Sequence, residues 1–571
     1  MITQSQIYES VPQQTVEQNP NITDERELAQ VTLTQLQIEV TLQNGIREKG
    51  QKLKFPQDLS PVSISVLIAA RTDVALVSPG DKSQSGKKQS LTSEQRRNLP
   101  IGIYQTEGDN QGVYEITNDP YGAFGELVEK YKPDATRREK LEVFTLVKGR
   151  LKVVQKCVTP YFVAVNNGVW DMKAKILHPF SPDSVFTSKI HTNLNLCATN
   201  PVITIPEDGT TWDVNSWFDS LGSPTFVESI KEVIQAACLP LAPRNKMVLF
   251  MNSAGNNGKG TVCQLIRNLL GEEVVISIPI AEFSERFALA DLPKAIAVIV
   301  DENDVNSFGK GMGNLKAAIT GDVVKIEQKY RDVYDYAFRG LVLQCVNDMP
   351  KGDDKSGSFK RRLHIIQFEN CFTGAEKRYI KGRLIYREDV LEYILKMVLS
   401  DMDYREEFTE TAETKKALGL YVRMTNSVAA FLQEILPKCQ WDLLPATDFL
   451  YSAYRTYYKR VNPSGKVIGR NDFIESVKEF AATDEYASLE WEWTDCTRSS
   501  GYINPDVYEP LLVEYNLTAF MRYGCSTYFE DRYYAHQFKL KEKYSGLKRR
   551  SATGNVQTAN NTDTSEVKDN D

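Results

Sequence analysis

The sequence predicts an α/β fold in which helices pack against a parallel β-sheet. Short, continuous apolar runs of strand length occur within residues 246–270, 294–304 and 340–350. Runs of this kind are typical of strands that are buried on both faces of a parallel sheet. The first run leads through a loop rich in glycine and asparagine into a stretch whose apolar residues recur at helical spacing. This order predicts a strand, a loop and a helix in succession.

The segment at residues 246–270 suits a phosphate-binding loop. It reads KMVLFMNSAGNNGKGTVCQLIRNLL. A loop that enters a helix N-terminus directs backbone N–H groups and the positive end of the helix dipole at an anion. Lys259 is placed in this loop to reach the terminal phosphates of a nucleotide.

The loop departs from the pattern GxxxxGK[ST]. Ser253 stands where the first glycine belongs, Gly260 replaces the magnesium-binding Ser or Thr, and Thr261 comes one position late. Taken alone, the segment is also compatible with a glycine-rich turn before an ordinary helix. The candidate nucleotide-binding residues are Ser253, Ala254, Gly255, Asn256, Asn257, Gly258, Lys259, Gly260 and Thr261.

The second run, KAIAVIVDEND at residues 294–304, ends in adjacent carboxylates. A P-loop ATPase needs one acid there to hold magnesium through water and a second acid to polarise the attacking water. Asp301 fits the first role and Glu302 the second, and Thr261 is the candidate hydroxyl ligand of magnesium. The same acidic strand end would also suit the start of a solvated loop.

Two further elements follow in order. The run GLVLQCVNDMP places Asn347 just past a strand end, where a polar side chain can sense the γ-phosphate, although asparagine also forms ordinary turns. The segment SGSFKRRLHIIQF places Arg361 and Arg362 immediately before another strand. Arginine neutralises charge on a transferring phosphoryl group, and in ring ATPases the neighbouring subunit supplies it. Arginine pairs are also common as surface charge.

These elements, which occur within about 120 residues, resemble those of a known family. The matching strings are NSAGNNGKGT, AVIVDEN, LKAAITGDVVKIEQKYRD, LVLQCVNDMP and SFKRRLHIIQF. They resemble the helicase part of phage and plasmid primase-helicases, which belong to helicase superfamily 3 of the AAA+ ATPases, as does the poxvirus primase-helicase. The resemblance implies an AAA+ P-loop ATPase core that binds ATP and Mg²⁺ and assembles into a ring, expected to be a hexamer.

The resemblance also assigns a role to the segment LKAAITGDVVKIEQKYRDVYDYAF, which begins at residue 315. Its alternating pattern suggests a β-hairpin, and in superfamily 3 helicases a hairpin here projects into the central channel and grips one DNA strand. Acidic residues nearly balance the basic ones, so a charged surface hairpin is the alternative. The candidate DNA-binding residues are Lys325, Lys329 and Arg331, with Tyr330 as a stacking surface.

Weaker matches lie on both sides of this core. Residues 161–183 are similar to the strand-rich segment that precedes the ATPase, and residues 448–480 to the family's winged-helix region. Lys466 and Arg470 suit phosphate contact in a helix-turn-helix arrangement; an ordinary helical bundle with solvated basic residues is the alternative. The expected organisation is a polar, partly disordered region at 1–95, an α+β domain at 96–225, the superfamily 3 AAA+ ATPase at 226–400, a winged-helix-like DNA-binding domain at 415–545 and a disordered tail at 546–571.

The composition is that of a globular protein with several domains. The 571 residues are 42% hydrophobic and 25% charged. No apolar run approaches the roughly 18 residues that cross a bilayer, and the N-terminus lacks a signal-peptide core, so we expect a cytoplasmic protein without membrane contact. Nine scattered cysteines without a CxxC pair and four histidines argue against a zinc finger or ribbon. The net charge of −7 disfavours tight nonspecific duplex binding, but a ring needs basic residues only in its channel.

Together these features predict an ATP-dependent DNA helicase that forms a ring and serves the replication of a phage, plasmid or similar mobile element. It would act on single-stranded or forked DNA and move along one strand. The first 160 residues contain neither an apolar strand ending in D-x-D nor a histidine, so we expect any primase or polymerase to be a separate partner. Two alternatives stay open: a DNA-binding replication initiator or scaffold that binds ATP without turnover, which Gly260 favours, and a primase-helicase with an unrecognised primase domain.

Overall fold

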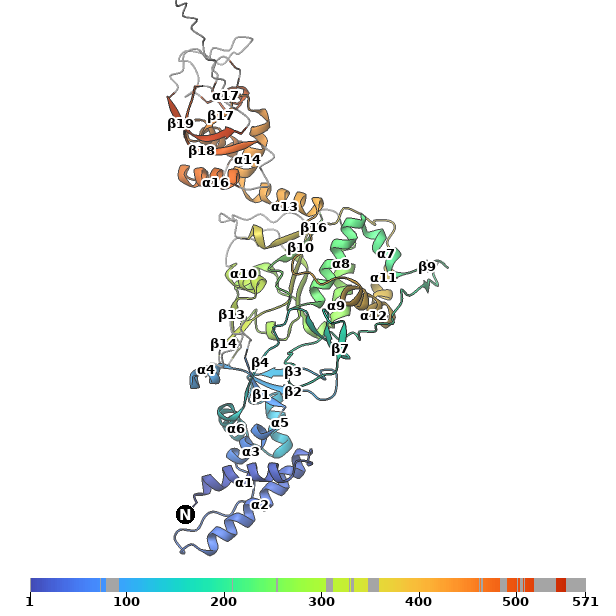
Figure 1. Cartoon of the computed structure of the whole chain (residues 1–571), viewed down its shortest axis with the longest axis vertical. Coiled ribbons are helices and arrows are strands. Elements are labelled where there is room, and N and C mark those ends of the chain that lie inside the picture. Colours follow the sequence, from blue (N-terminus) through green and yellow to red (C-terminus); the bar gives the residue numbers. More distant parts are fainter. Residues whose placement is uncertain are drawn as a thin grey trace, which may run out of the picture. The chain divides into compact units, whose positions relative to one another are not determined.

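The computed structural model divides the chain into two units (Figure 1). Unit 1 spans Met1–Leu418 and unit 2 spans Gly419–Asp571. Within the residues that the structure describes, no helix is long and apolar enough to span a lipid bilayer. The described residues are 2–71, 73–78, 92–207, 209–252, 255–303, 312–327, 329, 333–347, 359–461, 463, 466–482, 490–500, 502–503, 507, 509–517 and 541–550.

Unit 1 begins with helices that pack on a small sheet with the strand order β3-β2-β1-β4. The first helix starts at a capping box. The Thr3 side chain accepts a hydrogen bond from the Gln6 backbone N–H, and the Gln6 side chain accepts one from the Thr3 backbone N–H. The elements are α1 (Gln4–Gln18), α2 (Glu25–Gly45), α3 (Pro61–Ala70), β1 (Val74–Ser78), α4 (Ser93–Asn98), β2 (Ile101–Tyr104), β3 (Tyr114–Thr117), α5 (Ala123–Tyr131), α6 (Arg137–Arg150) and β4 (Val153–Gln155).

The first 95 residues form part of this packed region, although their sequence is polar. In α2 the apolar residues Leu36 and Val40 are fully buried among its many polar ones. Leu76 of β1 and Ile101 of β2 lie on opposite sides of position 95 and share one hydrophobic core. The structure therefore shows helices and a strand within the stretch that the sequence suggested to be partly disordered, and residues 79–91 of that stretch lie outside the described residues.

Residues 162–238 pack into the core of the larger sheet that follows them. Trp170, for example, is fully buried, and its indole Nε1 donates a hydrogen bond to the Leu399 carbonyl oxygen at 3.1 Å. The elements of this stretch are β5 (Phe162–Val165), β6 (Gly168–Asp171), β7 (Ile176–His178), β8 (Ile203–Thr204), β9 (Thr211–Trp212), α7 (Val214–Leu221) and α8 (Pro224–Cys238).

The larger sheet has five strands in the order β11-β12-β15-β10-β16, and all neighbouring strands are parallel. It confirms the parallel sheet predicted from the apolar runs. Its central strands β10 and β15 consist only of buried residues, because both faces of the sheet are covered. The sheet and its first helix comprise β10 (Met247–Met251), α9 (Lys259–Leu270), β11 (Val275–Ile276), β12 (Ala297–Asn303), β15 (Leu341–Val346) and β16 (Leu363–Gln367).

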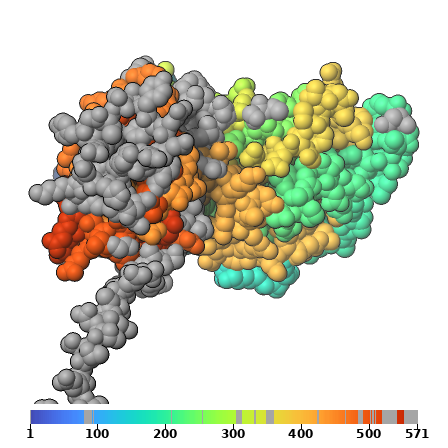
Figure 2. All heavy atoms as spheres, turned by 90° about the horizontal axis from the view of Figure 1, so that it is seen from above, coloured from blue at the N-terminus to red at the C-terminus, as the bar shows by residue number. Residues whose placement is uncertain are grey.

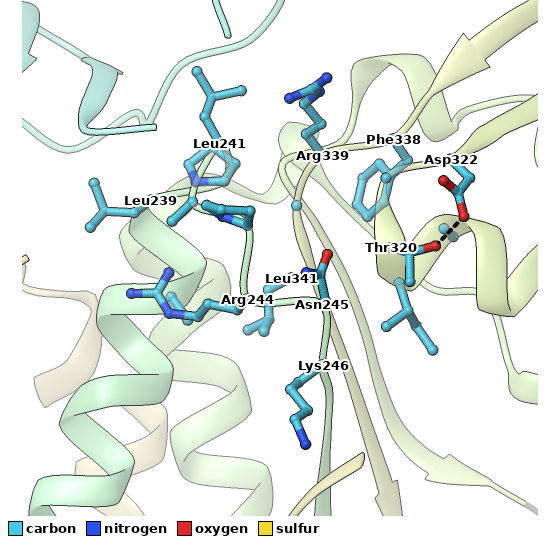
Figure 3. A pocket seen from close by; sticks show the side chains of 18 residues that line it. Leu239, Leu241, Arg244, Asn245, Lys246, Thr320, Asp322, Phe338, Arg339 and Leu341 are labelled. Atoms are coloured by element: carbon cyan, nitrogen blue, oxygen red, sulfur yellow. Dashed lines mark hydrogen bonds between the residues drawn. The ribbon is translucent and has the colours of Figure 1, made fainter. Parts of the chain in front are cut away.

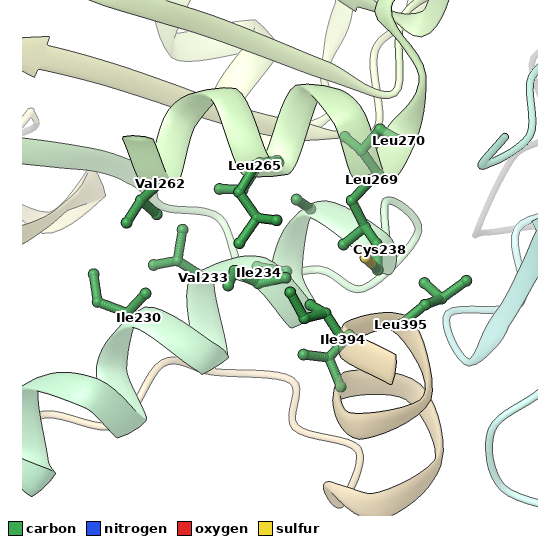
Figure 4. Close-up of a cluster of buried hydrophobic side chains, with 14 of the residues drawn as sticks. Ile230, Val233, Ile234, Cys238, Val262, Leu265, Leu269, Leu270, Ile394 and Leu395 are labelled. Carbon is green, nitrogen blue, oxygen red and sulfur yellow. The ribbon is translucent and has the colours of Figure 1, made fainter. Parts of the chain in front are cut away.

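Three helices, α8, α9 and α12, bury their apolar faces against one another (Figure 4). Ile234 of α8, Leu265 of α9 and Ile394 of α12 are fully buried there, and burial of each such side chain contributes roughly 1.5–3 kcal/mol. This packing fixes α9, and with it the loop before α9. The remaining elements around the sheet are η1 (Glu272–Val274), η2 (Ile280–Ser284), η3 (Leu292–Lys294), η5 (Lys360–Arg362), α11 (Arg378–Gly382), η6 (Leu384–Tyr386), α12 (Glu388–Lys396) and η7 (Met397–Asp401).

The segment that contains α11 and α12 also contacts α7 and the stretch between β8 and β9 that precedes it. Tyr393 Oη donates a hydrogen bond to Asn215 Oδ1 at 3.1 Å, and Arg383 Nη2 pairs with Glu207 Oε2 at 2.9 Å. In Figure 2 the green and the yellow-to-orange parts of the chain lie side by side on the surface. Two of the residues in contact, Asn215 and Tyr393, are 178 positions apart in sequence, so distant segments lie together on this surface.

A helix and a β-hairpin lie between β12 and β15 in the chain. α10 (Gly313–Thr320) leads into β13 (Val323–Ile326), which pairs antiparallel with β14 (Tyr334–Ala337). The hairpin predicted from the alternating sequence is therefore present. The base of the hairpin is joined to the small N-terminal sheet, because Lys156 Nζ, just after β4, donates a hydrogen bond to Tyr336 Oη at 3.0 Å.

Unit 2 combines helices with a three-stranded antiparallel sheet of order β17-β19-β18. Tyr454 and Phe473 pack in its core with tilted rings, whose centroids are 4.9 Å apart. The sequence assigned residues 546–571 to a disordered tail. The structure instead includes residues 546–549 in the last strand, where Leu547 is fully buried. Residues 551–571 lie outside the described residues. The elements are α13 (Ala412–Thr425), which begins in unit 1, α14 (Ser427–Ile435), η8 (Leu436–Lys438), β17 (Leu443–Pro445), η9 (Ala446–Leu450), α15 (Tyr451–Val461), α16 (Arg470–Ala482), β18 (Trp491–Arg498), α17 (Pro510–Glu514) and β19 (Lys543–Arg549).

Candidate functional site

The loop between β10 and α9 ends in a left-handed turn. Gly258 has φ +89° and immediately precedes the first residue of α9, Lys259. A side chain is disfavoured at that φ value, so glycine suits the position. The Asn257 side-chain oxygen accepts a hydrogen bond from the Lys259 backbone N–H at 3.3 Å. Two candidates from the sequence, Ser253 and Ala254, lie outside the described residues.

The Lys259 side chain is only 7% exposed and lies at the carboxyl edge of the sheet. Its Nζ donates hydrogen bonds to the Asn252 carbonyl oxygen and to Asn347 Oδ1, each at 3.4 Å. Asn347 Nδ2 in turn donates to Glu302 Oε1 at 3.0 Å. Burial lowers the pKa of Lys259, although Glu302 and two nearby thiols act in the opposite direction. Three of the predicted residues thus form a hydrogen-bonded chain, which we call the Lys259–Asn347–Glu302 network.

The strand order explains this arrangement. β15 lies between β10 and β12, and all three strands run in the same direction, so their carboxyl ends meet at one edge of the sheet. Ligands of open α/β sheets bind at this edge. Lys259 follows β10, Asn347 follows β15 and Glu302 lies near the end of β12.

Asp301 points to the opposite face of β12 from Glu302. Its carboxylate, about half exposed, accepts a hydrogen bond from Arg267 Nη2 at 3.2 Å. Arg267 belongs to α9 and also donates to the Ile299 carbonyl oxygen at 2.8 Å. Adjacent residues of a strand point to opposite faces, so Asp301 does not join the Lys259–Asn347–Glu302 network.

The acidic residues near the loop are too few for an all-protein metal cage. Among the described residues there is no group of three or more His, Cys, Asp and Glu side chains that could hold a metal ion. Mg²⁺ in phosphate-binding sites is held by one or two carboxylates together with phosphate oxygens and water. Glu302 is a carboxylate of the type that such sites use and belongs to the Lys259–Asn347–Glu302 network, whereas Asp301 is paired with Arg267.

A cavity of about 810 Å³ adjoins the start of α9. Gly258 and Thr261 line it on one side, and α7 and α11 supply the other walls. The loop and the segment before α11 are joined by two hydrogen bonds: the Phe372 backbone N–H donates to the Asn256 carbonyl oxygen at 2.7 Å, and Asn256 Nδ2 donates to Glu376 Oε1 at 2.9 Å. The cavity is large enough for a small-molecule ligand.

Sequence reasoning did not find these cavity walls. They come from residues about 40 positions before and 120 positions after the loop. The apolar spacing of α7 indicates a helix, but no motif connects either segment with the loop. An aromatic-rich stretch, TWDVNSWF at residues 211–218, was the available signal. The aromatic and cationic residues that line the cavity are Trp212, Trp217, Phe372, Lys377, Arg378 and Lys381.

The two arginines before β16 lie at the opposite edge of the sheet from Lys259. β16 pairs in parallel with β10, with Leu363 beside Met247 and Gln367 beside Met251. Arg361 and Arg362 precede Leu363, whereas the loop with Lys259 follows Met251. Arg361 is exposed and Arg362 is partly buried. Within one chain the structure does not bring these arginines to the Lys259–Asn347–Glu302 network.

A smaller cavity of about 250 Å³ also lies at this far edge (Figure 3). It is lined by the segments before β10 and β15, including Arg244 and Arg339, and by the residues between α10 and β13. None of the residues predicted to bind nucleotide or DNA lines it. We assign it no role.

The candidate DNA-binding residues lie in two places. Lys325 of β13 and Lys329 of the hairpin are exposed, and no described carboxylate pairs with either; Glu327 between them pairs instead with Arg286 Nε at 2.9 Å. Tyr330 and Arg331 lie outside the described residues. In unit 2, Lys466 and Arg470 are exposed. Arg470 begins α16, and its guanidinium lies 5.8 Å from the centre of the ring of Tyr451, the first residue of α15.

Comparisons with known proteins give one family match. Residues 251–362, about a fifth of the chain, match a family of unknown function, DUF5906. The matched range contains the described loop residues, Asp301, Glu302, Asn347 and both arginines. It therefore groups the predicted site residues within one family segment without assigning an activity to it.

Similar solved structures include three of the apo C-terminal region of NrS-1. One has 13% sequence identity and a TM-score of 0.37, and the match covers 67% of this chain and 81% of that one. The second has 12% identity, a TM-score of 0.38 and coverage of 74% and 86%. The third has 12% identity, a TM-score of 0.35 and coverage of 65% and 86%. At these TM-scores the likeness supports no conclusion about function.

Proposed function

We propose that the protein is an ATP-dependent DNA helicase of the superfamily 3 AAA+ type, which forms a ring, with six subunits by family resemblance, and moves along one DNA strand. The observation that supports the proposal best is the Lys259–Asn347–Glu302 network. It connects a buried lysine, an amide and a carboxylate at the carboxyl edge of a parallel sheet. An adjoining cavity of about 810 Å³ leaves space for a nucleoside. We found no other described site that combines these features.

In the proposed site each side chain has a separate task. Lys259 and the backbone N–H groups at the start of α9 would bind the β- and γ-phosphates. Asn347 would detect the γ-phosphate, and Glu302 would accept a hydrogen bond from the attacking water and polarise it. Asp301, while paired with Arg267, would contact magnesium through water, with Thr261 as a further ligand. Bound Mg²⁺ would neutralise charge on the phosphate oxygens.

Assembly into a ring would complete the site. Arg361 and Arg362 lie at the far edge of their own sheet, so we propose that one of them reaches the nucleotide of a neighbouring subunit. Hydrolysis around the ring would then move the hairpin that bears Lys325 and Lys329 along one strand. Unit 2 would be the winged-helix-like DNA-binding domain, with Lys466 and Arg470 on phosphates.

The test measures ATP hydrolysis with and without single-stranded DNA, and strand displacement on a forked duplex. The wild type should hydrolyse ATP, with stimulation by DNA, and should separate the strands. Lys259→Ala and Glu302→Gln should lose both activities, since the first removes phosphate binding and the second removes the carboxylate that polarises water. Lys294→Ala and Glu285→Gln change exposed residues outside the site and should retain them. Wild-type protein that binds ATP tightly but never hydrolyses it would contradict the helicase.

The same experiment separates the two alternatives. A replication initiator or scaffold would bind ATP and DNA without turnover. Gly260 favours that function, because it removes the hydroxyl that binds magnesium directly in the GxxxxGK[ST] pattern. A primase-helicase would also synthesise primers on a single-stranded template, which the isolated chain should not do.

Ring formation has its own test. Negative-stain electron microscopy with a non-hydrolysable ATP analogue should show closed rings of six subunits. Particles that stay monomeric under those conditions would rule out an arginine acting across a subunit boundary. Rings that do not unwind DNA would favour the scaffold instead.

A further inference from the structure

Gly260, the residue at which the loop departs most from the phosphate-binding pattern, faces a lysine. A Cβ atom built on Gly260 would have one described neighbour within 4 Å, the Nζ atom of Lys381, at 3.3 Å. Lys381 belongs to α11, more than 100 residues further along the chain. The position where most P-loops carry a hydroxyl thus lies open in front of an ammonium group.

Lys381 also lines the same cavity as Gly258 and Thr261. Its side chain is exposed, and among the described residues no carboxylate forms an ion pair with it. Two residues further on, Arg383 is paired with Glu207 at 2.9 Å and is directed elsewhere. The charge of Lys381 is therefore available to a ligand in the cavity, whereas the charge of Arg383 is already compensated.

The position of α11 relative to the loop is fixed by hydrogen bonds. The Phe372 N–H donates to the Asn256 carbonyl oxygen at 2.7 Å, and Asn256 Nδ2 donates to Glu376 Oε1 at 2.9 Å. These contacts join the α11 segment to the loop that leads to Lys259. Lys381 consequently approaches the loop from the cavity side, while Lys259 approaches from within the sheet edge.

We propose that Lys381 is a second cationic ligand of the nucleotide phosphates, supplied by the same chain, and that Gly260 is glycine because a Cβ there, 3.3 Å from Nζ, would push the ammonium group aside by a few tenths of an ångström. This inference rests on the proposed nucleotide site and adds to it a residue that the loop pattern does not contain. An ammonium group is a compact point charge that suits phosphate oxygens. Two lysines on opposite sides of the phosphates would compensate for the hydroxyl that the loop lacks at residue 260.

Nucleotide titrations of the full chain test the inference. Binding of ATP, ADP and adenosine is measured by isothermal calorimetry for the wild type, Lys381→Ala, Lys381→Arg and Lys377→Ala. Loss of one charge-assisted phosphate contact should weaken ATP and ADP binding about 10-fold in Lys381→Ala, and adenosine binding should not change. Lys381→Arg should bind ATP more tightly than the alanine variant. Lys377→Ala is the matched control, since Lys377 lines the same cavity but is not among the atoms within 4 Å of the Gly260 Cβ position.

A double-mutant cycle tests the role of Gly260. Gly260→Ala should weaken ATP binding when Lys381 is present and should have little further effect in Lys381→Ala, because the two changes act on one contact. Additive losses would contradict the coupling. If the wild type binds ATP and the Lys381→Ala variant binds ATP with equal affinity, this inference is overturned while the proposed function is not. Wild type that binds neither ATP nor ADP would instead overturn the proposed function.

Discussion

Replacing Asn347 by alanine should separate catalysis from binding. Asn347 accepts a hydrogen bond from Lys259 Nζ at 3.4 Å and donates one to Glu302 Oε1 at 3.0 Å. The first contact is long, and the second reaches an exposed carboxylate. The loss of both should therefore lower the free energy of unfolding by only about 1 kcal/mol. The folded state should survive the substitution.

The catalytic effect should be much larger than the effect on stability. Removal of one preorganised group at a reacting centre typically lowers kcat about 10²–10³-fold. We expect Asn347→Ala to lower kcat for ATP hydrolysis about 100-fold, which corresponds to about 2.7 kcal/mol of activation free energy. The Kd for ATP should change less than about 3-fold, because Lys259 and the loop N–H groups stay in place.

Phosphate release measured at several ATP concentrations gives kcat and KM, and titration with a fluorescent ATP analogue gives Kd. Asn268→Ala is a matched control: Asn268 lies near the other end of α9, and its Nδ2 donates a hydrogen bond to the Ile385 carbonyl oxygen at 2.9 Å. Asn268 Oδ1 also accepts a hydrogen bond from Gln264 Nε2 at 2.9 Å. The variant therefore loses an amide and two hydrogen bonds, as Asn347→Ala does, but should retain kcat. An Asn347→Ala enzyme with wild-type kcat, or an Asn268→Ala enzyme equally impaired, would refute the reasoning.

Three further predictions concern stability and DNA. Burial lowers the pKa of His364 from 6.5 to about 4, so protonation favours the unfolded state. The free energy of unfolding measured in urea should therefore fall by up to about 3 kcal/mol between pH 6.5 and pH 4. The His364→Phe variant should lack this pH-dependent loss. Gly258→Ala should lower the free energy of unfolding by about 1–2 kcal/mol, because the φ of +89° at this position disfavours a side chain. Gly255→Ala should not lower it, because a Cβ atom there would have no neighbour within 4 Å. The double variant Lys325→Ala/Lys329→Ala should weaken single-stranded DNA binding about 10-fold in fluorescence anisotropy, reduce its salt dependence and leave ATP binding unchanged.

The sheet and its loop could be predicted because their signals are local. The apolar run before the loop became β10, and the helical spacing after it became α9, which begins at Lys259. Continuous apolar runs indicate strands buried on both faces, and the strands β12 and β15 were found in this way. The meeting of Glu302 and Asn347 follows once these strands are parallel neighbours.

The remaining features depend on contacts between distant segments. The ion pair of Asp301 with Arg267 could not be predicted, because a carboxylate at a strand end looks the same whether or not a helix supplies a partner. Lys381 comes from a five-residue helix without a periodic pattern. The apolar spacing of α7 indicates a helix but does not show that Trp217 borders the loop. The N-terminal helices were hidden by their composition, since a few buried residues such as Leu36 suffice to anchor a largely polar helix.

The hydrogen bond between Lys156 and Tyr336 has a mechanical consequence. It joins the end of β4 to β14 across 3.0 Å, and the Lys156 ammonium also lies 5.2 Å from the centre of the Tyr336 ring. A hairpin held in this way cannot move independently of the small N-terminal sheet. A movement of the hairpin base would either break the hydrogen bond between Lys156 and Tyr336 or move the small N-terminal sheet with it. The small sheet would therefore limit the amplitude of any hairpin movement.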